Sequence, residues 1–255
     1  MAHFENHELR FSVQTTPLSA FHKTMEPEPT FLDLQCPHCS ETVSFPEGLQ
    51  TKVQECPNCL ENIIVPDEPG PLAEKVPLPI ETPHLLLRRL HHDDWKDLLE
   101  CFSDEQLFDY VKSGPTNEER IAEWLEKDSF TKLTSPNAWF YLALQHRETE
   151  KVIGDVHWHL EDDRSKATLD VYVHQSFQRQ GFGTEALKAT LRFCLIVLGI
   201  RRIVVSCDVR NTGASRMCEK AGMRREGQFL KDSFLNGEWA STFQYAMLAE
   251  EFRDP

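Results

Sequence analysis

The sequence predicts an α/β protein of the α+β type, with one large domain of mixed strands and helices preceded by a small module. Three observations lead to this prediction. Two identical cysteine motifs lie near the start of the chain, a proline-rich stretch follows them, and the remainder alternates strand-like and helix-like patterns around one glycine-rich turn. A chain of 255 residues has room for one core of about 150 to 200 residues and a small module besides.

The small module is predicted from the motifs Cys36-Pro-His-Cys39 and Cys56-Pro-Asn-Cys59. Tetrahedral Zn²⁺ binds four thiolates, and two residues between cysteines allow one tight turn to present both sulfur atoms. Short β-prone runs lie around the pairs, at 41–45, 51–54 and 62–65. We therefore expect a zinc ribbon with one structural Zn²⁺, whose ligands are Cys36, Cys39, Cys56 and Cys59. Two disulfides in a secreted module, or iron in place of zinc, are the alternatives.

The other four cysteines are scattered through strand and helix patterns without pairing logic: Cys101, Cys194, Cys207 and Cys218. Such cysteines are typical of small buried side chains in a reducing compartment, so we expect a cytoplasmic protein. No window approaches the roughly eighteen consecutive apolar residues of a membrane span, and we expect none.

Charge is unevenly distributed along the chain. Residues 1–83 carry 13 acidic and 4 basic side chains, a net charge of −9, whereas residues 84–255 carry −5. Nucleic-acid binding depends on Lys and Arg side chains that neutralise phosphates, so the acidic N-terminal third argues against it. An acidic surface suits a cationic or amine-bearing partner instead.

Composition divides the chain into four parts. We expect a mobile arm over 1–30 with one short strand at 9–13, the ribbon over 31–67, a semi-stiff proline-rich linker over 68–83, and a single domain over 84–255.

Within the last part, hydrophobic periodicity predicts a series of strands and helices. Strands are expected at 84–90, 138–145, 151–160, 168–173 and 202–208. Helices are expected from Asp93 to 102, after the capping-box-like Thr116-Asn-Glu-Glu119, from Thr184 onward, and between 211 and 219.

The segment Gln178-Arg-Gln-Gly-Phe-Gly183 lies between a predicted strand and a long predicted helix. Such a turn directs free backbone N–H groups and the positive end of the helix toward one point, which suits a diphosphate. Glycine allows the backbone to approach phosphate oxygens closely. The glycine spacing differs from that of the dinucleotide-binding fingerprint. A plain connecting turn is the alternative.

This turn and its flanking segments resemble the GNAT superfamily of acyl-CoA-dependent N-acetyltransferases. The nearer likeness is to the branch of ribosomal-protein N-terminal alanine acetyltransferases and their relatives. The likeness covers roughly 82–251 and rests on the glycine turn, Asn211-Thr-Gly-Ala-Ser215, Glu219-Lys-Ala-Gly222 and Leu235-Asn-Gly-Glu-Trp239. It implies a GNAT fold, in which helices flank a mixed, splayed and mostly antiparallel central sheet. It does not extend to the ribbon.

The resemblance also implies where acetyl-CoA, the cosubstrate, binds. Backbone groups of Val171 and Val173 would pair with the pantetheine arm. Asn211 would steady the pantetheine or the turn; an ordinary helix cap is the alternative. The pyrophosphate would be held by consecutive residues, with Arg179 as a counter-charge: Gln178, Arg179, Gln180, Gly181, Phe182, Gly183 and Thr184.

The sequence departs from its relatives at the proton-transfer positions. The tyrosine that many GNAT enzymes use as an acid corresponds to Cys218, and the glutamate of the alanine-acetylating branch corresponds to Ser233. The resemblance leaves Ser215 as the candidate donor to the leaving thiolate, although Ser215 also fits a helix cap.

Several side chains are candidates for the general base. Asp170 lies on the strand that meets the cofactor, Asp232 lies near the Asn-Gly turn, and Glu238 is third. Each of them otherwise fits an exposed carboxylate. His157 and His159 alternate with Trp158, so both project from one face of a strand. On the substrate side they would bind or deprotonate an amine; a solvated outer face is the alternative.

We therefore expect an acetyl-CoA-dependent N-acetyltransferase. It would transfer an acetyl group to a primary amine, either a protein N-terminus or a small amine, by direct attack in a ternary complex. The ribbon would bind a protein partner or stabilise the chain. The alternative is a non-catalytic CoA-binding module with the ribbon as adaptor, which the replaced tyrosine and glutamate favour.

Overall fold

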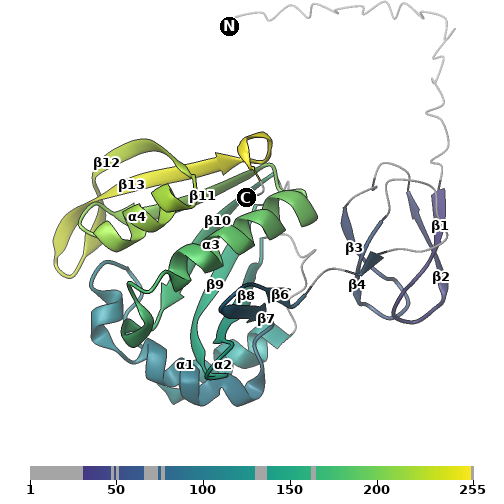
Figure 1. Ribbon diagram of the computed structural model, residues 1–255, viewed down its shortest axis with the longest axis horizontal. Coiled ribbons are helices and arrows are strands. Elements are labelled where there is room, and N and C mark those ends of the chain that lie inside the picture. The colour runs from purple at the N-terminus through teal and green to yellow at the C-terminus, as the bar shows by residue number, and fades with distance from the viewer. Residues whose placement is uncertain are drawn as a thin grey trace, which may run out of the picture.

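The computed structural model describes residues 31–46, 49, 52–65, 74–75, 78–129, 137–161 and 165–253. The predicted arm over 1–30, its strand at 9–13 and much of the predicted linker lie outside the described residues. Figure 1 shows a small group of strands beside a larger domain of strands and helices.

The large domain is built on one eight-stranded sheet (Figure 1). The strand order is β12-β13-β11-β10-β9-β8-β7-β6, and all neighbours are antiparallel except β10 and β11. The strands are β6 (Ile80–Glu81), β7 (Leu85–Arg88), β8 (Trp139–His146), β9 (Val152–Leu160), β10 (Lys166–Val173), β11 (Arg202–Asp208), β12 (Arg224–Leu235) and β13 (Glu238–Leu248). The mixed, mostly antiparallel sheet confirms the expected fold class, and β6 extends it into the predicted linker.

Helices cover both faces of this sheet (Figure 1). The helices are α1 (Trp95–Phe102), α2 (Glu118–Ser129), α3 (Phe182–Arg192), its π-helical continuation η4 (Phe193–Val197) and α4 (Thr212–Lys220). Single turns of 3-10 helix join them: η1 (His92–Asp94), η2 (Glu105–Phe108), η3 (Gln175–Phe177) and η5 (Ala249–Glu251). The first two helices pack on one face and the last two on the other, so the sheet is the middle layer.

The helix termini follow from short-range chemistry. α1 buries Leu98, Cys101 and Phe102, which share one side because they are three or four residues apart. The cap of α2 is Asn117, whose side-chain oxygen accepts from the Arg120 amide at 3.0 Å. The expected capping box beginning at Thr116 is therefore displaced by one residue, and asparagine supplies the same kind of acceptor.

Alternation along β10 assigns its side chains to the two faces. Leu169 is fully buried in the cluster that includes α3, whereas Tyr172 packs in the cluster that includes α1 and α2. Asp170 therefore lies on the α1/α2 face, next to Tyr172 on alternate positions of the same strand. This placement decides which side of the sheet carries the ionisable groups.

The small module consists of two short antiparallel sheets. Its strands are β1 (Phe31–Gln35), β2 (Thr42–Pro46), β3 (Val53–Glu55), β4 (Asn62–Ile64) and β5 (Glu74–Lys75). β1 pairs with β2, and β4 pairs with both β3 and β5. Val53 also belongs to the buried cluster of the large domain, with Ile64 packed against it, so this strand pair contacts that domain.

Candidate functional site

The parallel strands β10 and β11 separate toward one end. Within these fully described strands, three residue pairs join them, from Lys166 with Arg202 to Thr168 with Val204. Beyond Thr168, β10 continues for five residues to Val173 with its other edge still paired to β9. A wedge therefore opens between the two strands, and backbone groups of β10 face into it.

The hydrogen-bond pattern shows which groups of β10 face the wedge. The Lys166 carbonyl accepts from the backbone amide of Glu161, the residue that follows β9, at 3.0 Å. The His174 amide donates to the backbone carbonyl of Ile153 on β9 at 2.7 Å. Even-numbered residues thus bond toward β9, and the N–H and C=O groups of odd-numbered residues point toward β11. Val171 and Val173 belong to the second set, as their expected role requires. The Val173 carbonyl, however, already accepts from Gln178 Nε2 at 3.0 Å.

The glycine-rich turn follows the end of β10 directly. Arg179 and Gly181 adopt positive φ angles of 60° and 99°, and Gly181 is the N-cap of α3. The Gln180 side chain donates to the Ser176 carbonyl at 2.9 Å and braces the turn. The first amides of α3 therefore project at the mouth of the wedge, where an N-terminal helix end favours an anion.

Gly183 lies at a close contact between α3 and α4. A Cβ on this residue would lie 3.1 Å from Met217 Sδ on α4 and 3.6 Å from a Val173 methyl. A Cβ on Gly181, in contrast, would meet nothing within 4 Å. Glycine at position 181 is thus favoured by the left-handed backbone conformation. Glycine at position 183 is favoured by the close contact of α3 with α4.

The N-terminus of α4 carries the two predicted residues from the Asn211 to Ser215 segment. Asn211 Oδ1 accepts from the Ala214 amide at 3.0 Å, so its cap role is real. The Ser215 hydroxyl lies 3.6 Å from Cys207 Sγ on β11. Cys218 is fully buried, and burial raises its pKa to about 12, so this thiol stays protonated at neutral pH.

Sequence reasoning missed a tyrosine near Ser215. Tyr245 on β13 is 1% exposed, and its hydroxyl donates to Glu219 Oε1 at 3.3 Å. Burial raises the pKa of Tyr245, while a hydrogen bond with Ser215 opposes the rise. In the sequence Tyr245 appears only in the Tyr245-Ala-Met-Leu segment of the family resemblance, and β13 brings it to Glu219 on α4 from 26 positions further along the chain.

Asp170 lies beside His157 on the α1/α2 face of the sheet. The two residues are directly opposite in the β9–β10 register, and Asp170 Oδ2 is 3.7 Å from His157 Nε2. His157 Nδ1 lies 2.5 Å from Asp155 Oδ2. Burial raises the pKa of Asp170, and Asp155 raises it further although His157 opposes the shift. Asp155 was missed in the sequence, where its only signal is an acid on the same face as His157 in an apolar strand.

The other candidate carboxylates lie on the β12–β13 hairpin. Asp232 Oδ2 accepts from the Thr242 hydroxyl at 2.8 Å, on the neighbouring strand. Glu238 forms an ion pair with Arg210, which also binds the buried Asp208 at 2.7 Å. Both carboxylates therefore have local partners, unlike Asp170, whose neighbours are ionisable groups of the adjoining strand.

The four predicted metal ligands lie together. Their sulfur atoms are all within 4.8 Å of one another, with 3.7 Å between Cys36 and Cys59 and 3.9 Å between Cys39 and Cys56. A tetrahedron with 2.3 Å zinc–sulfur bonds has edges of about 3.8 Å, so the donor set fits Zn²⁺. The two turns are also copies of each other: the residue after each second cysteine has φ near +60°, 62° at Ser40 and 64° at Leu60.

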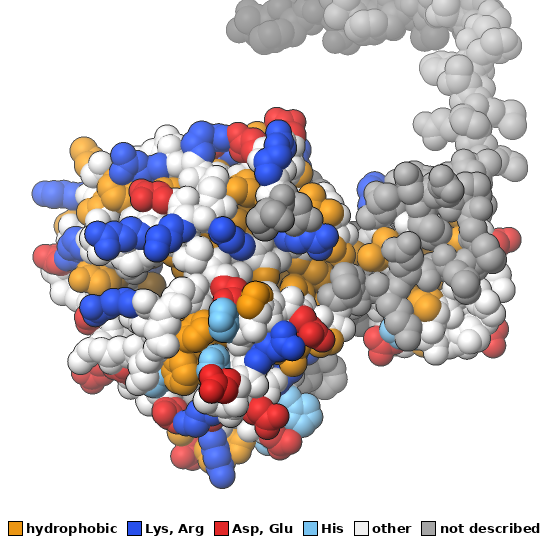
Figure 2. Space-filling view, viewed as in Figure 1, with side chains coloured by type: hydrophobic (Ala, Val, Ile, Leu, Met, Phe, Trp, Pro, Cys, Tyr) orange, Lys and Arg blue, Asp and Glu red, His pale blue; other side chains and the backbone are white. Residues whose placement is uncertain are grey.

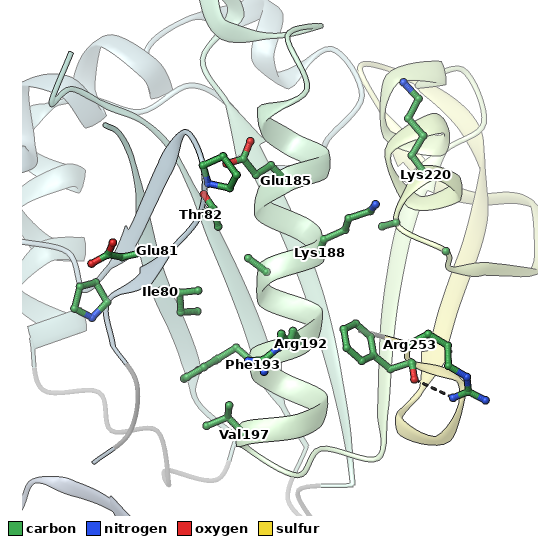
Figure 3. A pocket seen from close by; sticks show the side chains of 16 residues that line it. Ile80, Glu81, Thr82, Glu185, Lys188, Arg192, Phe193, Val197, Lys220 and Arg253 are labelled. Carbon is green, nitrogen blue, oxygen red and sulfur yellow. Dashed lines mark hydrogen bonds between the residues drawn. The ribbon is translucent and has the colours of Figure 1, made fainter. Parts of the chain in front are cut away.

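A hollow of about 680 Å³ lies along the exposed side of α3 (Figure 3). The residues around β6 form one wall, and the end of α4 with the last described residues forms the other. Lys188 extends from α3 toward α4, and Lys220 lies on α4 (Figure 3). Neither lysine has an ion pair within the described part of the chain. The hollow is on the opposite side of the sheet from Asp170.

Across the residues that the structure describes, no helix combines the length and apolarity needed to cross a membrane.

Comparison with known proteins gives a consistent result. A family model described as an acetyltransferase (GNAT) domain matches residues 84–224. The uncharacterized N-acetyltransferase YnaD of Bacillus subtilis is 27% identical over 173 residues, which is 68% of this chain and 98% of that protein.

Two solved structures are similar in fold. A GNAT-family acetyltransferase from Bacillus anthracis has a TM-score of 0.61 at 27% identity, covering 68% of this chain and 99% of its own. Spermidine N-acetyltransferase from Vibrio cholerae, in complex with CoA and spermine, has a TM-score of 0.59 at 19% identity, covering 67% and 98%. The family model spans more than half of this chain, and the protein therefore belongs to the GNAT acetyltransferase family and is an N-acetyltransferase.

Proposed function

We propose that this enzyme transfers the acetyl group of acetyl-CoA to a primary amine by direct attack in a ternary complex. The wedge between β10 and β11 carries this proposal, because it ends at the glycine turn and at the first amides of α3. The pantetheine arm would enter the wedge as an added strand along Val171, while the amides from Gln178 to Thr184 hold the pyrophosphate. Asn211 would steady the turn at the other side of the wedge.

Basic side chains support the binding of the remaining phosphate charge. Figure 2 shows Lys and Arg side chains across the face that carries α3 and α4, although the whole chain has a net charge of −14. Lys188 and Lys220 contribute to this face, and Arg179 extends it at the turn. Local positive potential on an otherwise acidic protein favours approach of the tetra-anionic cofactor from this side.

Two residues are assigned to the proton transfers. Asp170 faces the α1/α2 side, where it would hold the acceptor's ammonium group beside His157 while that group loses its proton. Ser215 would donate to the departing thiolate from the N-terminus of α4, with the Tyr245 hydroxyl behind it. We keep Asp232 as a second carboxylate candidate, and we rank it lower because Thr242 already binds it.

The acceptor is proposed to be either a protein N-terminus or a small amine. Primary amines are cationic before reaction, and the acceptor side presents Asp155 and Asp170 behind aromatic rings, which suits an ammonium group. The spermine complex of the Vibrio cholerae enzyme and the likeness to N-terminal alanine acetyltransferases each support one of these acceptor classes. Membership of a family of N-acetyltransferases argues against a non-catalytic CoA-binding module.

We further propose that the small module is a zinc ribbon with a structural role or a role in binding a protein partner. Soft thiolates in a tetrahedral set select Zn²⁺, and Cys36, Cys39, Cys56 and Cys59 would be its ligands. Free thiolates as ligands require a reducing compartment, and we therefore place the protein in the cytoplasm.

The proposed function is tested by measuring CoA release from acetyl-CoA with a panel of polyamines, monoamines and N-terminal peptides. We expect transfer to at least one class, with mass spectrometry showing one added acetyl group on the amine. Calorimetry should show CoA binding in the micromolar range typical of such enzymes. Absence of CoA binding would overturn the proposal, and transfer only to hydroxyl or thiol groups would overturn the choice of acceptor.

A further inference from the structure

We propose that His157 is the proton acceptor of the acetyl transfer, that Asp155 positions it from the buried side, and that Asp170 holds the acceptor ammonium opposite it. This inference rests on the proposed function and assigns the proton-transfer step to a set of three side chains. It makes His157 and Asp170 catalytic residues and Asp155 a positioning residue.

The three side chains lie on one face of β9 and β10 and differ in exposure. The side chain of Asp155 is 1% exposed, that of His157 is 14% exposed and that of Asp170 is 35% exposed. Exposure to solvent therefore increases from Asp155 through His157 to Asp170. A substrate reaches Asp170 first and His157 second, and Asp155 stays out of contact with it.

The hydrogen bond to Asp155 fixes the tautomer of His157. The carboxylate can only accept at 2.5 Å, so Nδ1 of the imidazole carries the proton. Nε2 of the neutral ring then has a free lone pair, and it points toward Asp170. The 3.7 Å between Nε2 and Asp170 Oδ2 is too long for a hydrogen bond, so both atoms remain available to the N–H groups of a substrate.

Aromatic rings enclose His157 and separate it from bulk water. The Tyr172 ring stacks on the imidazole, with 5.6 Å between the ring centroids and 14° between the ring planes. The ring centroids of Tyr141 and Trp139 lie 4.8 Å and 5.3 Å from that of the imidazole. These contacts limit the ring to one orientation. Trp139 is itself 41% exposed, so the enclosure is open on the side from which an acceptor can enter.

The buried carboxylate is a costly feature that packing alone does not explain. Asp155 is fully buried, and its Oδ1 has no hydrogen-bond partner among the described residues. Burying a charge with an unsatisfied oxygen lowers the stability of a fold, and an apolar pair of similar volume is often as stable as a buried ion pair. The benefit of Asp155 is therefore expected in the chemistry of His157.

The electrostatics match the chemistry required. Burial lowers the pKa of His157, but the charge and hydrogen bond of Asp155, with the charge of Asp170, outweigh burial and raise it overall. A base with a raised pKa is better matched to an ammonium group than an ordinary carboxylate.

Other ionisable groups around the site are Tyr141, His159, Tyr172 and, from α1, Cys101. Burial raises the pKa of both Tyr172 and Cys101, which therefore stay neutral near pH 7. The charges acting on His157 are thus mainly those of the two aspartates.

The proton balance of the reaction is complete with these groups. The acceptor ammonium gives one proton to His157 Nε2, and the resulting amine attacks the thioester carbonyl carbon. A C–N bond forms, the C–S bond breaks, and the sulfur takes the bonding electron pair. The nitrogen's second proton leaves as the amide forms, and Ser215 passes it to the thiolate by donating its hydroxyl proton and taking the nitrogen's proton in return. The imidazolium between two carboxylates later releases its proton to water.

The test compares Asp155→Asn, His157→Gln and the double variant in the full-length protein. Two readouts are needed: the titration of His157 by NMR without substrate, and the pH dependence of kcat/KM. We expect Asp155→Asn to move the His157 titration and the acidic limb of kcat/KM to lower pH together, and to lower kcat about tenfold to a hundredfold. In the His157→Gln background, Asp155→Asn should have little further effect on kcat.

Asp94→Asn is the matched control, because Asp94 is also a buried carboxylate, paired with Arg88 at 2.7 Å outside the site. The Asp94→Asn variant should have a changed thermal stability, whereas the acidic limb of its kcat/KM profile should stay at the wild-type pH. If Asp155→Asn fails to fold, His157→Gln alone decides, because wild-type kcat over the whole pH range in that variant would overturn the proposal. Asp155→Asn could also lower kcat without moving the titration of His157 or the acidic limb of kcat/KM. That result would show that Asp155 has only a structural role. If wild-type protein acetylates no amine, the proposed function fails first.

Discussion

Asn236, at the tip of the β12–β13 hairpin, donates a hydrogen bond from Nδ2 to the Asp109 carbonyl at 3.2 Å, across 127 positions of sequence. Asp109 directly follows η2. The ring of Phe108 in η2 packs against the ring of Tyr172 on β10, with 6.3 Å between the ring centroids. Tyr172 lies beside Asp170 on the same face of that strand. The residue after η2 and the tip of the β12–β13 hairpin therefore touch each other. The hydrogen bond and the ring contact together link the hairpin tip to β10.

Replacing Asn236 with alanine is expected to weaken acceptor binding. Loss of one hydrogen bond of about 1 kcal/mol should raise KM for the amine about fivefold, while the Kd for CoA stays the same. Steady-state kinetics and calorimetry give the two values. Gln228→Ala, an exposed position on the same hairpin, is the control, and an equal rise in KM there would contradict a specific role for the contact.

Gly181→Ala separates the backbone cost of the glycine turn from its ligand role. Gly181 and Gly199 lie near opposite ends of the α3–η4 helix with φ angles of 99° and 66°, and an added Cβ meets nothing within 4 Å at either site. Each alanine should cost about 1 kcal/mol in the free energy of unfolding. Only Gly181→Ala should also weaken CoA binding, as measured by calorimetry, since its amides face the proposed pyrophosphate site. Equal losses of affinity would disprove this placement.

Ser215→Ala tests the donor to the leaving thiolate. We expect kcat to fall about tenfold to a hundredfold with an unchanged Kd for CoA, because the hydroxyl would act only as negative charge develops on sulfur. Ser206→Ala, on the neighbouring strand β11, serves as the control. Comparison of acetyl-CoA with a thioester of a more acidic thiol is informative: the variant should recover part of its rate with the better leaving group. No recovery would speak against proton donation by Ser215.

The stability of the protein should depend on pH through His157. Burial lowers its pKa, but Asp155 and Asp170 raise it above the ordinary value of about 6.5. A group with a raised folded-state pKa contributes stability that is fully present below the unfolded-state pKa and is lost as pH rises through the folded-state value. Urea unfolding at several pH values should show His157→Gln destabilising the protein more at low pH than at high pH. A pH-independent difference would contradict the raised pKa.

Removal of one zinc ligand should affect the small module and leave CoA binding intact. Cys39→Ala is expected to reduce bound zinc from one equivalent to a small fraction, because three thiolates leave the tetrahedral set incomplete. Elemental analysis of the purified protein gives the stoichiometry, and calorimetry gives the Kd for CoA. Cys218→Ala is the matched control, since this buried cysteine lies outside the cluster. A wild-type protein without zinc or another metal would contradict the ribbon proposal.

Local patterns in the sequence predicted much of the architecture. Apolar periodicity located the five predicted strands of the large domain and the helices on both sides of the glycine turn. The spacing of the cysteine pairs placed four thiols that the fold brings within 4.8 Å. These features are predictable because strand alternation, helix capping and a two-residue metal turn depend on residues that are close in sequence.

The site on the α1/α2 face was predicted only in part. Asp170 was a candidate from its position on β10, and His157 and His159 were assigned to one face without a choice between substrate and solvent. Asp155 and Tyr245 were not among the predicted site residues, because their partners are determined by strand order and by the register of the sheet.

By itself the sequence determined the zinc-ligand candidates, the order of five strands and four helices of the large domain, and the glycine turn at the start of α3, since each is encoded in a short run of residues. Only the tertiary structure decided that β10 and β11 separate after Thr168, that the hairpin reaches Asp109, and that Asp155 and Asp170 both lie next to His157. These relationships join strands distant along the chain, and they are fixed by which strands pair and by the alternation of side chains across the sheet.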